Sequence, residues 1–308
     1  MTSDKEQERA VTAGAPSCSA AAPGVLPPGP ASQDVECAAA LLRDADRVLV
    51  GAGAGLSAAA GLVYEGERFE RNFAPFIAMY GLTDMYTAGF YPFPSEEARC
   101  AYWARHVWTN RHEPPALPLY QALWEYARDR DCFVVTTNVD GQFEKAGFPP
   151  ERVFATQGDY GLNQCARGCH DTLYPNRALA AEMIAQTEDC LVPSALVPRC
   201  PVCGGPMAVH LRVDGHFVEN VDWHAAQDRY LRFVEDMRGR PTVLLELGVG
   251  WNTPGIIRLP FEALARAFYA PLVRLNRDDA RIADAGVRRG VELQGDVAAL
   301  WPLLAGAE

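Results

Sequence analysis

Short runs of apolar and β-branched residues recur along the chain, and turn-forming residues end each run. The runs cover residues 47–50, 132–137, 152–156, 242–247, 272–276 and 291–294. Apolar runs of this length between turn signals predict buried strands. Between them lie segments with helical spacing, such as 117–128, where Leu119, Leu123 and Tyr126 fall on one face. Strands that alternate with helices predict an α/β fold with a doubly wound parallel sheet.

A glycine-rich turn follows the first predicted strand. Gly51, Gly53 and Gly55 precede an alanine-rich segment that favours a helix, with Ser57 at its expected start. This arrangement can bind phosphate, because glycine lets the backbone approach closely and a helix start presents free N–H groups. No Gly-Lys-Ser/Thr follows, which excludes a P-loop, and no second strand with a terminal acid follows about 20 residues later. A glycine turn in a generic α/β protein is the alternative.

Polar or glycine residues also follow the later strands. Asn138 and Asp140 follow the second strand, and Gln157 follows the third. The tips of the last three strands carry Gly248 and Gly250, then Asn276, then Gly295 and Asp296. Open α/β sheets bind ligands at the carboxyl ends of their strands, so we expect these tips to line one crevice. For Asn138 and Asp140, an Asx turn is an equally good explanation.

Four cysteines form two close pairs, Cys165 with Cys169 and Cys200 with Cys203. The second pair is a Cys-x2-Cys knuckle flanked by turn residues, whereas three residues separate the first pair. Four thiolates in two close pairs predict one tetrahedral, structural zinc ion without an open coordination position. His170 is an alternative to Cys169 as a ligand, and disulfide bonds are the less favoured explanation.

Two further stretches differ in composition from the predicted sheet. Residues 1–33 are rich in alanine, proline, glycine and serine, which predicts a disordered tail. Asp34 is expected to cap the helix that follows. Residues 63–120 are rich in aromatic side chains. They predict a helical subdomain packed by those side chains, a mobile lid over a cofactor, or both.

Charge and composition narrow the classes of function. The chain has 308 residues, of which 49% are hydrophobic, and a formal charge of −11. The acidic balance argues against nucleic acid or an anionic membrane as the main partner. No apolar run approaches the ~20 residues that span a bilayer, and the charged N-terminus does not resemble a secretory signal. The nine cysteines are therefore expected in a reducing cytoplasm, where close pairs favour metal over disulfides.

In this order, the motifs resemble those of the sirtuin family of NAD-dependent enzymes. The resemblance covers residues 34–305 and rests on the glycine turn, 137–140, the four cysteines, 248–250, 276–277 and 295–297. It implies a Rossmann-like domain at 34–160 and 215–305, a zinc module inserted at about 161–214, and NAD consumed as co-substrate at their interface. The cofactor-binding residues that it implies are Gly51, Ala52, Gly53, Ser57, Gly61, Asn138, Asp140, Gln157, Gly248, Val249, Gly250, Asn276, Arg277, Asp296 and Val297.

Two departures from the family pattern bear on the activity. The usual Gly-Ile-Pro-Asp-Phe-Arg motif is replaced by Gly-Leu-Val-Tyr-Glu-Gly at 61–66, and Gln157 stands where the family has its catalytic histidine. The runs at 157–161 and 245–257, with the spacing of the first cysteine pair, are similar to the macrodomain-linked (class M) bacterial sirtuins. That resemblance implies a protein mono-ADP-ribosyltransferase, with a lipoyl-carrier protein as acceptor and a macrodomain hydrolase as partner.

The chemistry of Gln157 is consistent with this implication. A deacylase needs a general base near neutral pH, which histidine provides, whereas glutamine cannot take up a proton. Loss of a general base costs ~10²–10⁴-fold in the step that it serves. We expect Asn138 and Asp140 to orient the nicotinamide and ribose, with Gln157 as a hydrogen-bonding replacement. NAD-dependent deacylation and a catalytically weak NAD or ADP-ribose binding module are the alternatives.

Overall fold

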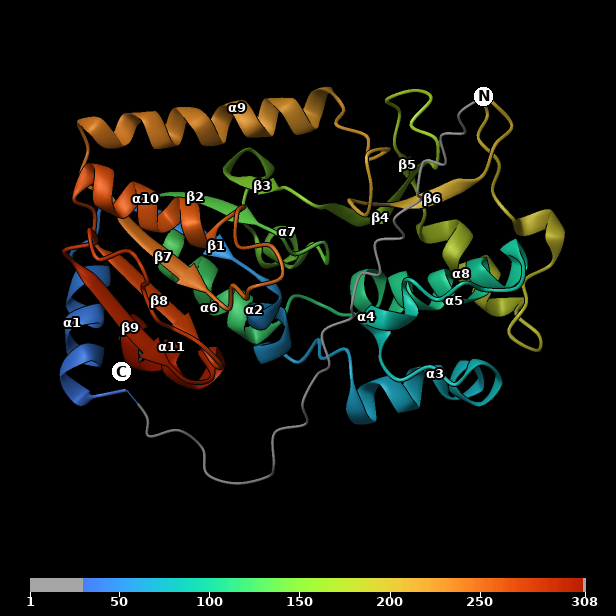
Figure 1. The fold of residues 1–308 in the computed structure, drawn as a ribbon, viewed down its shortest axis with the longest axis horizontal. Helices are drawn as coiled ribbons and strands as arrows, with labels where there is room; N and C mark the ends of the chain where they lie inside the picture. The colour runs from blue at the N-terminus through green and yellow to red at the C-terminus, as the bar shows by residue number, and fades with distance from the viewer. Residues whose placement is uncertain (1–29, 307–308) are drawn as a thin grey trace, which may run out of the picture.

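The computed structural model describes residues 30–306 and contains two sheets (Figure 1). The larger sheet has six strands in the order β3-β2-β1-β7-β8-β9, and all its neighbouring strands pair in parallel. Its strands are β1 (Arg47–Ala52), β2 (Asp131–Thr136), β3 (Val153–Ala155), β7 (Val243–Leu247), β8 (Leu272–Asn276) and β9 (Gly290–Gln294). The predicted doubly wound parallel sheet is confirmed, and its six strands coincide with the six apolar runs.

Helices cover both faces of this sheet (Figure 1). Side chains alternate between the faces along each strand: in β1, Val48 and Val50 join one apolar core and Leu49 joins the other. The first core includes α1 (Ser32–Arg43), α2 (Ala54–Ala59), α6 (Pro118–Ala127), α7 (Gln142–Ala146) and α11 (Val297–Ala305). The second includes α9 (Val221–Glu235) and α10 (Arg258–Phe268).

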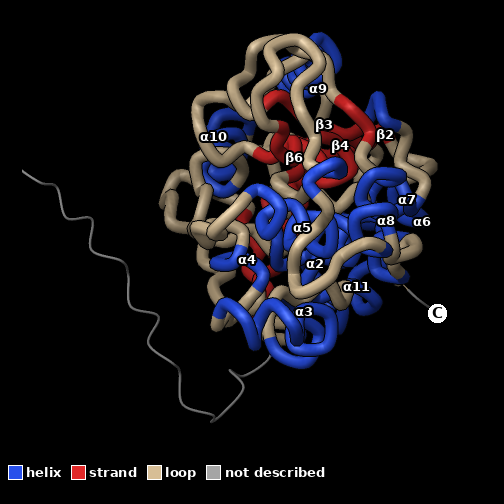
Figure 2. Tube along the Cα trace, turned by 90° about the vertical axis from the view of Figure 1, so that its right-hand side faces the viewer, coloured by secondary structure: helices blue, strands red, loops and turns tan. Residues whose placement is uncertain are grey.

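A second lobe combines helices with a small antiparallel sheet of order β5-β4-β6 (Figure 2). Aromatic side chains pack its core, around the fully buried Phe73 and Tyr102. Its elements are α3 (Gly66–Tyr80), α4 (Met85–Ala88), α5 (Glu96–Val107), β4 (Gly158–Cys165), β5 (Tyr174–Pro175), α8 (Arg177–Ala185) and β6 (Met207–Leu211). The short helical turns are η1 (Trp108–His112), η2 (Pro150–Arg152), η3 (Ser194–Leu196) and η4 (Asp236–Arg238). The expected helical subdomain over 63–120 is confirmed; the division at about 161 and 214 stays a prediction.

Two local expectations were wrong. The helix after the glycine turn begins at Ala54, because Gly53 is extended and serves as its N-cap; Ser57 lies inside the helix and bonds elsewhere. Asp34 lies in the first turn of α1, whose N-cap is Ala31.

The N-terminal segment and the length of the helices bear on two of the predictions. The predicted tail at 1–33 lies outside the described residues except for its last four, and α1 already begins at Ser32. Among the helices of residues 30–306, none combines the length and the apolar character that crossing a membrane would need.

Candidate active site

Two connected cavities lie at the carboxyl ends of the central strands. The first, of about 380 Å³, lies between the turns that follow β1, β7 and β8. The second, of about 530 Å³, extends from the glycine turn toward α4 and α5 of the second lobe. Residues that line both are Ala54, Gly55, Ala58, Thr137, Asn252, Thr253, Arg277 and Asp278. The two cavities therefore form one cleft, at the edge of the sheet where the sequence predicted a crevice.

Glycines bring the β1 and β7 turns into close contact. A Cβ on Gly53 would lie 2.7 Å from the carbonyl oxygen of Gly248, and one on Gly55 would lie 2.8 Å from the Gly248 Cα. Gly248 itself has φ +61°, which side chains rarely adopt. The turns thus present backbone, rather than side chains, to the cleft, which suits a pyrophosphate.

A hydrogen-bonded group of polar side chains forms the floor of the larger cavity. The Ser57 hydroxyl donates to Asp140 Oδ2 at 2.5 Å, and the backbone N–H of Gln142 donates to Asp140 Oδ1 at 3.0 Å. The Asn138 side-chain amide donates to the Gly53 carbonyl at 3.0 Å. Burial raises the pKa of the Asp140 carboxyl above its usual range, although the Ser57 hydrogen bond opposes the rise. Helix α2 and the turn after β2 thus bring Ser57, Asn138 and Asp140 together.

Gln157 lines the same cavity, on the side of the second lobe. Its backbone carbonyl accepts from the N–H of Arg212, and within the described chain its side-chain amide has no hydrogen-bond partner. One histidine, His106, also lines the cavity. Burial lowers the pKa of His106 to about 3, so its imidazole is neutral at pH 7 and is a poor general base. The described residues that line the cavity therefore include no histidine that can act as a general base.

The smaller cavity contains most of the remaining predicted cofactor residues. Val249, Gly250, Asn276, Arg277, Asp296 and Val297 all line it. The Asn276 amide donates to the Val249 carbonyl at 2.8 Å, so it ties the β7 and β8 turns together. Asp296 caps α11 by accepting from the N–H groups of Ala298 and Ala299.

Three predicted cofactor residues do not line either cavity. Gly51 lies in β1, and a Cβ there would lie 2.5 Å from Ile257 and 2.7 Å from Phe261, so α10 packs against its backbone. Ala52 is fully buried at the strand end. Gly61 has φ +103° with open space around it. Their structural roles are packing and turn formation, and contact with the cofactor stays a prediction.

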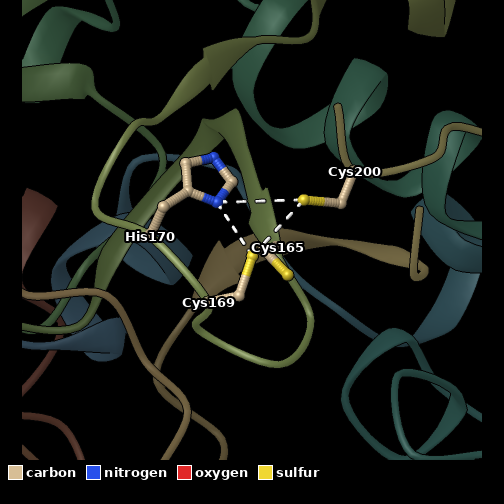
Figure 3. A group of neighbouring side chains, drawn as sticks. All are labelled: Cys165, Cys169, His170 and Cys200. Atoms are coloured by element: carbon tan, nitrogen blue, oxygen red, sulfur yellow. Dashed lines mark hydrogen bonds between the residues drawn. The ribbon is translucent and has the colours of Figure 1, made fainter. Parts of the chain in front are cut away.

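The four predicted cysteine ligands gather beside β4, and Figure 3 shows three of them, Cys165, Cys169 and Cys200. The Sγ atoms of Cys165 and Cys203 are 3.7 Å apart, and those of Cys169 and Cys200 are 3.6 Å apart. Disulfide sulfurs would lie about 2.05 Å apart, whereas thiolates at the corners of a tetrahedron about 2.3 Å from zinc lie roughly 3.8 Å apart. The geometry excludes disulfides and fits one structural zinc ion.

His170 joins this group of cysteines. Its Nδ1 lies 3.1 Å from Cys169 Sγ, and the ligand atoms of Cys165, Cys169, His170 and Cys200 all lie within 4.8 Å of one another (Figure 3). The structure therefore offers five candidate ligands for four positions. Which of them complete the site stays a prediction.

Buried polar residues of the site were missed by the sequence analysis. Tyr120 bonds to Ser57 and Asn138, and His106 lines the larger cavity. Arg258, also fully buried, donates to the Val249 carbonyl beneath the smaller cavity. Tyr120 and Arg258 lie on amphipathic helices, and His106 lies among aromatic residues, so no local signal separates them from packing residues.

Comparisons with known proteins agree with this geometry. No family model matches the chain. The chain is 34% identical over 262 residues to a protein ADP-ribosyltransferase of Staphylococcus aureus (strain Mu50), across 83% of this chain and 82% of the relative. It is 35% identical over 297 residues to a probable bifunctional ADP-ribose hydrolase/ADP-ribosyltransferase of Fusarium oxysporum f. sp. cubense, across 85% of this chain but only 46% of that relative.

The fold matches that of solved Sir2 enzymes. A crystal structure of a Sir2 homologue in complex with NAD superimposes with a TM-score of 0.59 at 16% identity, covering 88% of this chain and 92% of the other. Together with the relatives named as ADP-ribosyltransferases, the cleft and the fold identify the chain as an NAD-consuming transferase. The chain belongs to the sirtuin family, and the predicted NAD-dependent ADP-ribosyltransferase activity is confirmed.

Proposed function

We propose that this chain transfers a single ADP-ribose from NAD to a protein acceptor of the lipoyl-carrier type, with Asn138, Asp140 and Gln157 as its catalytic residues. NAD supplies the ADP-ribosyl group: the bond from C1′ to nicotinamide breaks, a bond from C1′ to the acceptor forms, and the acceptor loses a proton. The observation that carries the proposal is the absence, among the described residues lining the larger cavity, of a histidine that can act as a base.

The side chains have separate roles in this proposal. In its ionised form, Asp140 provides negative charge beside the reacting carbon, which becomes more positive in the transition state. Asn138 fixes the position of the bound ribose and nicotinamide by hydrogen bonding. Gln157 provides an amide that can hydrogen-bond a ribose hydroxyl without removing its proton.

The outer part of the larger cavity supports a protein acceptor with an apolar arm. Tyr86 is 56% exposed and Phe90 is 61% exposed, and both line this cavity. Leu211, at the end of β6, and Val213 also line it. Solved Sir2 structures with bound peptides share the fold, one of them with a myristoylated histone peptide. The Fusarium relative is named as both an ADP-ribose hydrolase and an ADP-ribosyltransferase, and we propose by analogy that an ADP-ribose hydrolase of the macrodomain type is a partner of this chain.

Intact-mass spectrometry tests the proposal. A lipoylated carrier protein and an acetylated peptide are each incubated with NAD and either the wild type or Asn138→Ala. We expect the carrier to gain the mass of one ADP-ribose with the wild type and to lose that gain with the variant. Removal of the acetyl group from the peptide, with an unmodified carrier, would instead establish deacylation.

A further inference from the structure

Tyr120 is the buried link between the polar residues of the active site. It lies on α6, has no exposed surface, and packs its ring edge-on against Phe143 at a centroid distance of 4.9 Å. Its hydroxyl lies 2.8 Å from Ser57 Oγ and 3.2 Å from Asn138 Nδ2. Burial raises the pKa of Tyr120 well above its ordinary value, so the hydroxyl keeps its proton.

The direction of each hydrogen bond in this group follows from the carboxylate at its end. Ionised Asp140 can only accept, so the Ser57 hydroxyl donates to it. The Ser57 oxygen is then free to accept, and the Tyr120 hydroxyl donates to it. The Tyr120 oxygen in turn accepts from the Asn138 amide.

This chain of bonds assigns the orientation of the Asn138 amide. One N–H of its Nδ2 donates to Tyr120 and the other donates to the Gly53 carbonyl at 3.0 Å. Both donors are therefore occupied. Among the described residues Oδ1 has no hydrogen-bond partner, and it is not among the enclosed, unpaired polar atoms, so it is accessible from the cavities that Asn138 lines. The larger of them also contains Asp140 and Gln157.

We infer that Tyr120 is a positioning residue, which holds Asn138 so that Oδ1, and not the N–H₂ group, faces the reacting centre. The inference rests on the proposed role of Asn138. Without the Tyr120 hydroxyl, one amide N–H and the Ser57 oxygen each lose a buried partner, and the amide can rotate. A carbonyl oxygen near C1′ favours developing positive charge, whereas an N–H₂ group opposes it.

The same helix provides a matched control. Tyr126 is also a buried tyrosine of α6, and its hydroxyl donates to the backbone carbonyl of Leu42 at 2.8 Å. Tyr126 does not line the cleft. Tyr120→Phe and Tyr126→Phe therefore each delete one buried hydroxyl, but only Tyr120→Phe changes the active site.

The experiment measures three quantities for the wild type and both variants. They are the kcat of nicotinamide release, the Kd for NAD, and the hydrogen-exchange rate of the Asn138 side-chain amide in ¹⁵N-asparagine-labelled protein, with Asn138→Ala to assign the signal. We expect Tyr120→Phe to lower kcat by about 10- to 100-fold and to speed amide exchange, with Kd little changed. Tyr126→Phe should match the wild type in all three.

The other possible outcomes also test the role of Tyr120. Equal kcat and equal exchange in Tyr120→Phe and the wild type would overturn the inference, as would a fall in kcat matched by Tyr126→Phe. If Tyr120→Phe does not fold, the wild-type spectrum alone decides: a slowly exchanging amide supports the inference and a freely exchanging one overturns it. A wild type that releases no nicotinamide would overturn the proposed function instead, and the exchange data would still decide the role of Tyr120.

Discussion

The carboxyl group of Asp140 gives the activity a predictable pH dependence. Its pKa is raised by burial, so it takes up a proton at a higher pH than an ordinary aspartate, whose pKa is about 3.9. The proposed role needs the ionised form. We therefore expect nicotinamide release to fall on acidification, with a midpoint above pH ~4, and Asp140→Asn to lower it by at least ~10²-fold while removing that acidic limb.

A pH profile of kcat for the wild type and Asp140→Asn checks this expectation. Glu144, exposed on α7, offers a control carboxylate outside the larger cavity. An acidic limb that persists unchanged in Asp140→Asn would assign it to another group.

His106 makes the protein sensitive to acid. Its pKa is lowered to about 3, so folding favours the neutral imidazole. Its contribution to stability is present above the ordinary histidine pKa of about 6.5 and is lost as the pH falls below it, by roughly 1.4 kcal/mol for each pH unit. We expect His106→Phe to lose less stability between pH 7 and pH 4.5, although it loses its bond to Tyr102.

Urea unfolding at the two pH values measures the difference. His224, whose side chain is 55% exposed, supplies the control substitution. Equal losses in the wild type and in His106→Phe would show that other groups control the acid sensitivity.

At the scale of elements, the contact between the β1 and β7 turns determines the shape of the cleft. Gly248 has φ +61°, and a Cβ there would clash with the backbone of Gly55 and Leu56. We expect Gly248→Ala to lower the free energy of unfolding by about 1–3 kcal/mol and to weaken NAD binding, because the turns must separate. Gly255→Ala is the control, since open space surrounds Gly255, its φ is not positive, and it lines neither cavity.

Chemical denaturation and NAD titration of both variants test this expectation. If Gly248→Ala and Gly255→Ala are equally stable and bind NAD equally well, the close packing of the two turns has no part in shaping the cleft.

The sequence predicts the sheet better than it predicts the site. Buried parallel strands produce continuous apolar runs, so β7 and β8 were located from their own residues. The start of α2 was misplaced, because Ser57 has the composition of a cap but uses its hydroxyl for Asp140. Tyr120 and His106 could not be predicted, since their contacts join residues from separate elements and no local pattern records them.

At the scale of the whole molecule, the two lobes have separate apolar cores. Among residues 30–306, only Cys165, Cys200 and Met207 form the buried cluster at the cysteine group, so the turns that carry the cysteines have little apolar support without a metal. We expect about one zinc ion per chain. Its removal by a chelator should split thermal unfolding into two transitions, because the sheet core keeps its own contacts.

Calorimetry before and after chelation, with metal analysis, tests this behaviour. Cys203→Ser is expected to lose zinc and His170→Ala to keep it, if the four cysteines are the ligands. A single transition that merely shifts after chelation would show that the two cores unfold as one unit.

The order of strands also has a consequence for the synthesis of this protein. Central strand β1 pairs with β2 on one side and with β7 on the other. The pairing of Val48 with Val243 therefore cannot form until residue 243 has been synthesised. A nascent chain therefore carries an unpaired, apolar strand edge until most of its length has left the ribosome. The NAD cleft is complete only after the Gly248 turn contacts the glycine turn. A translation product that ends before β7 therefore lacks half of the sheet and the cofactor site.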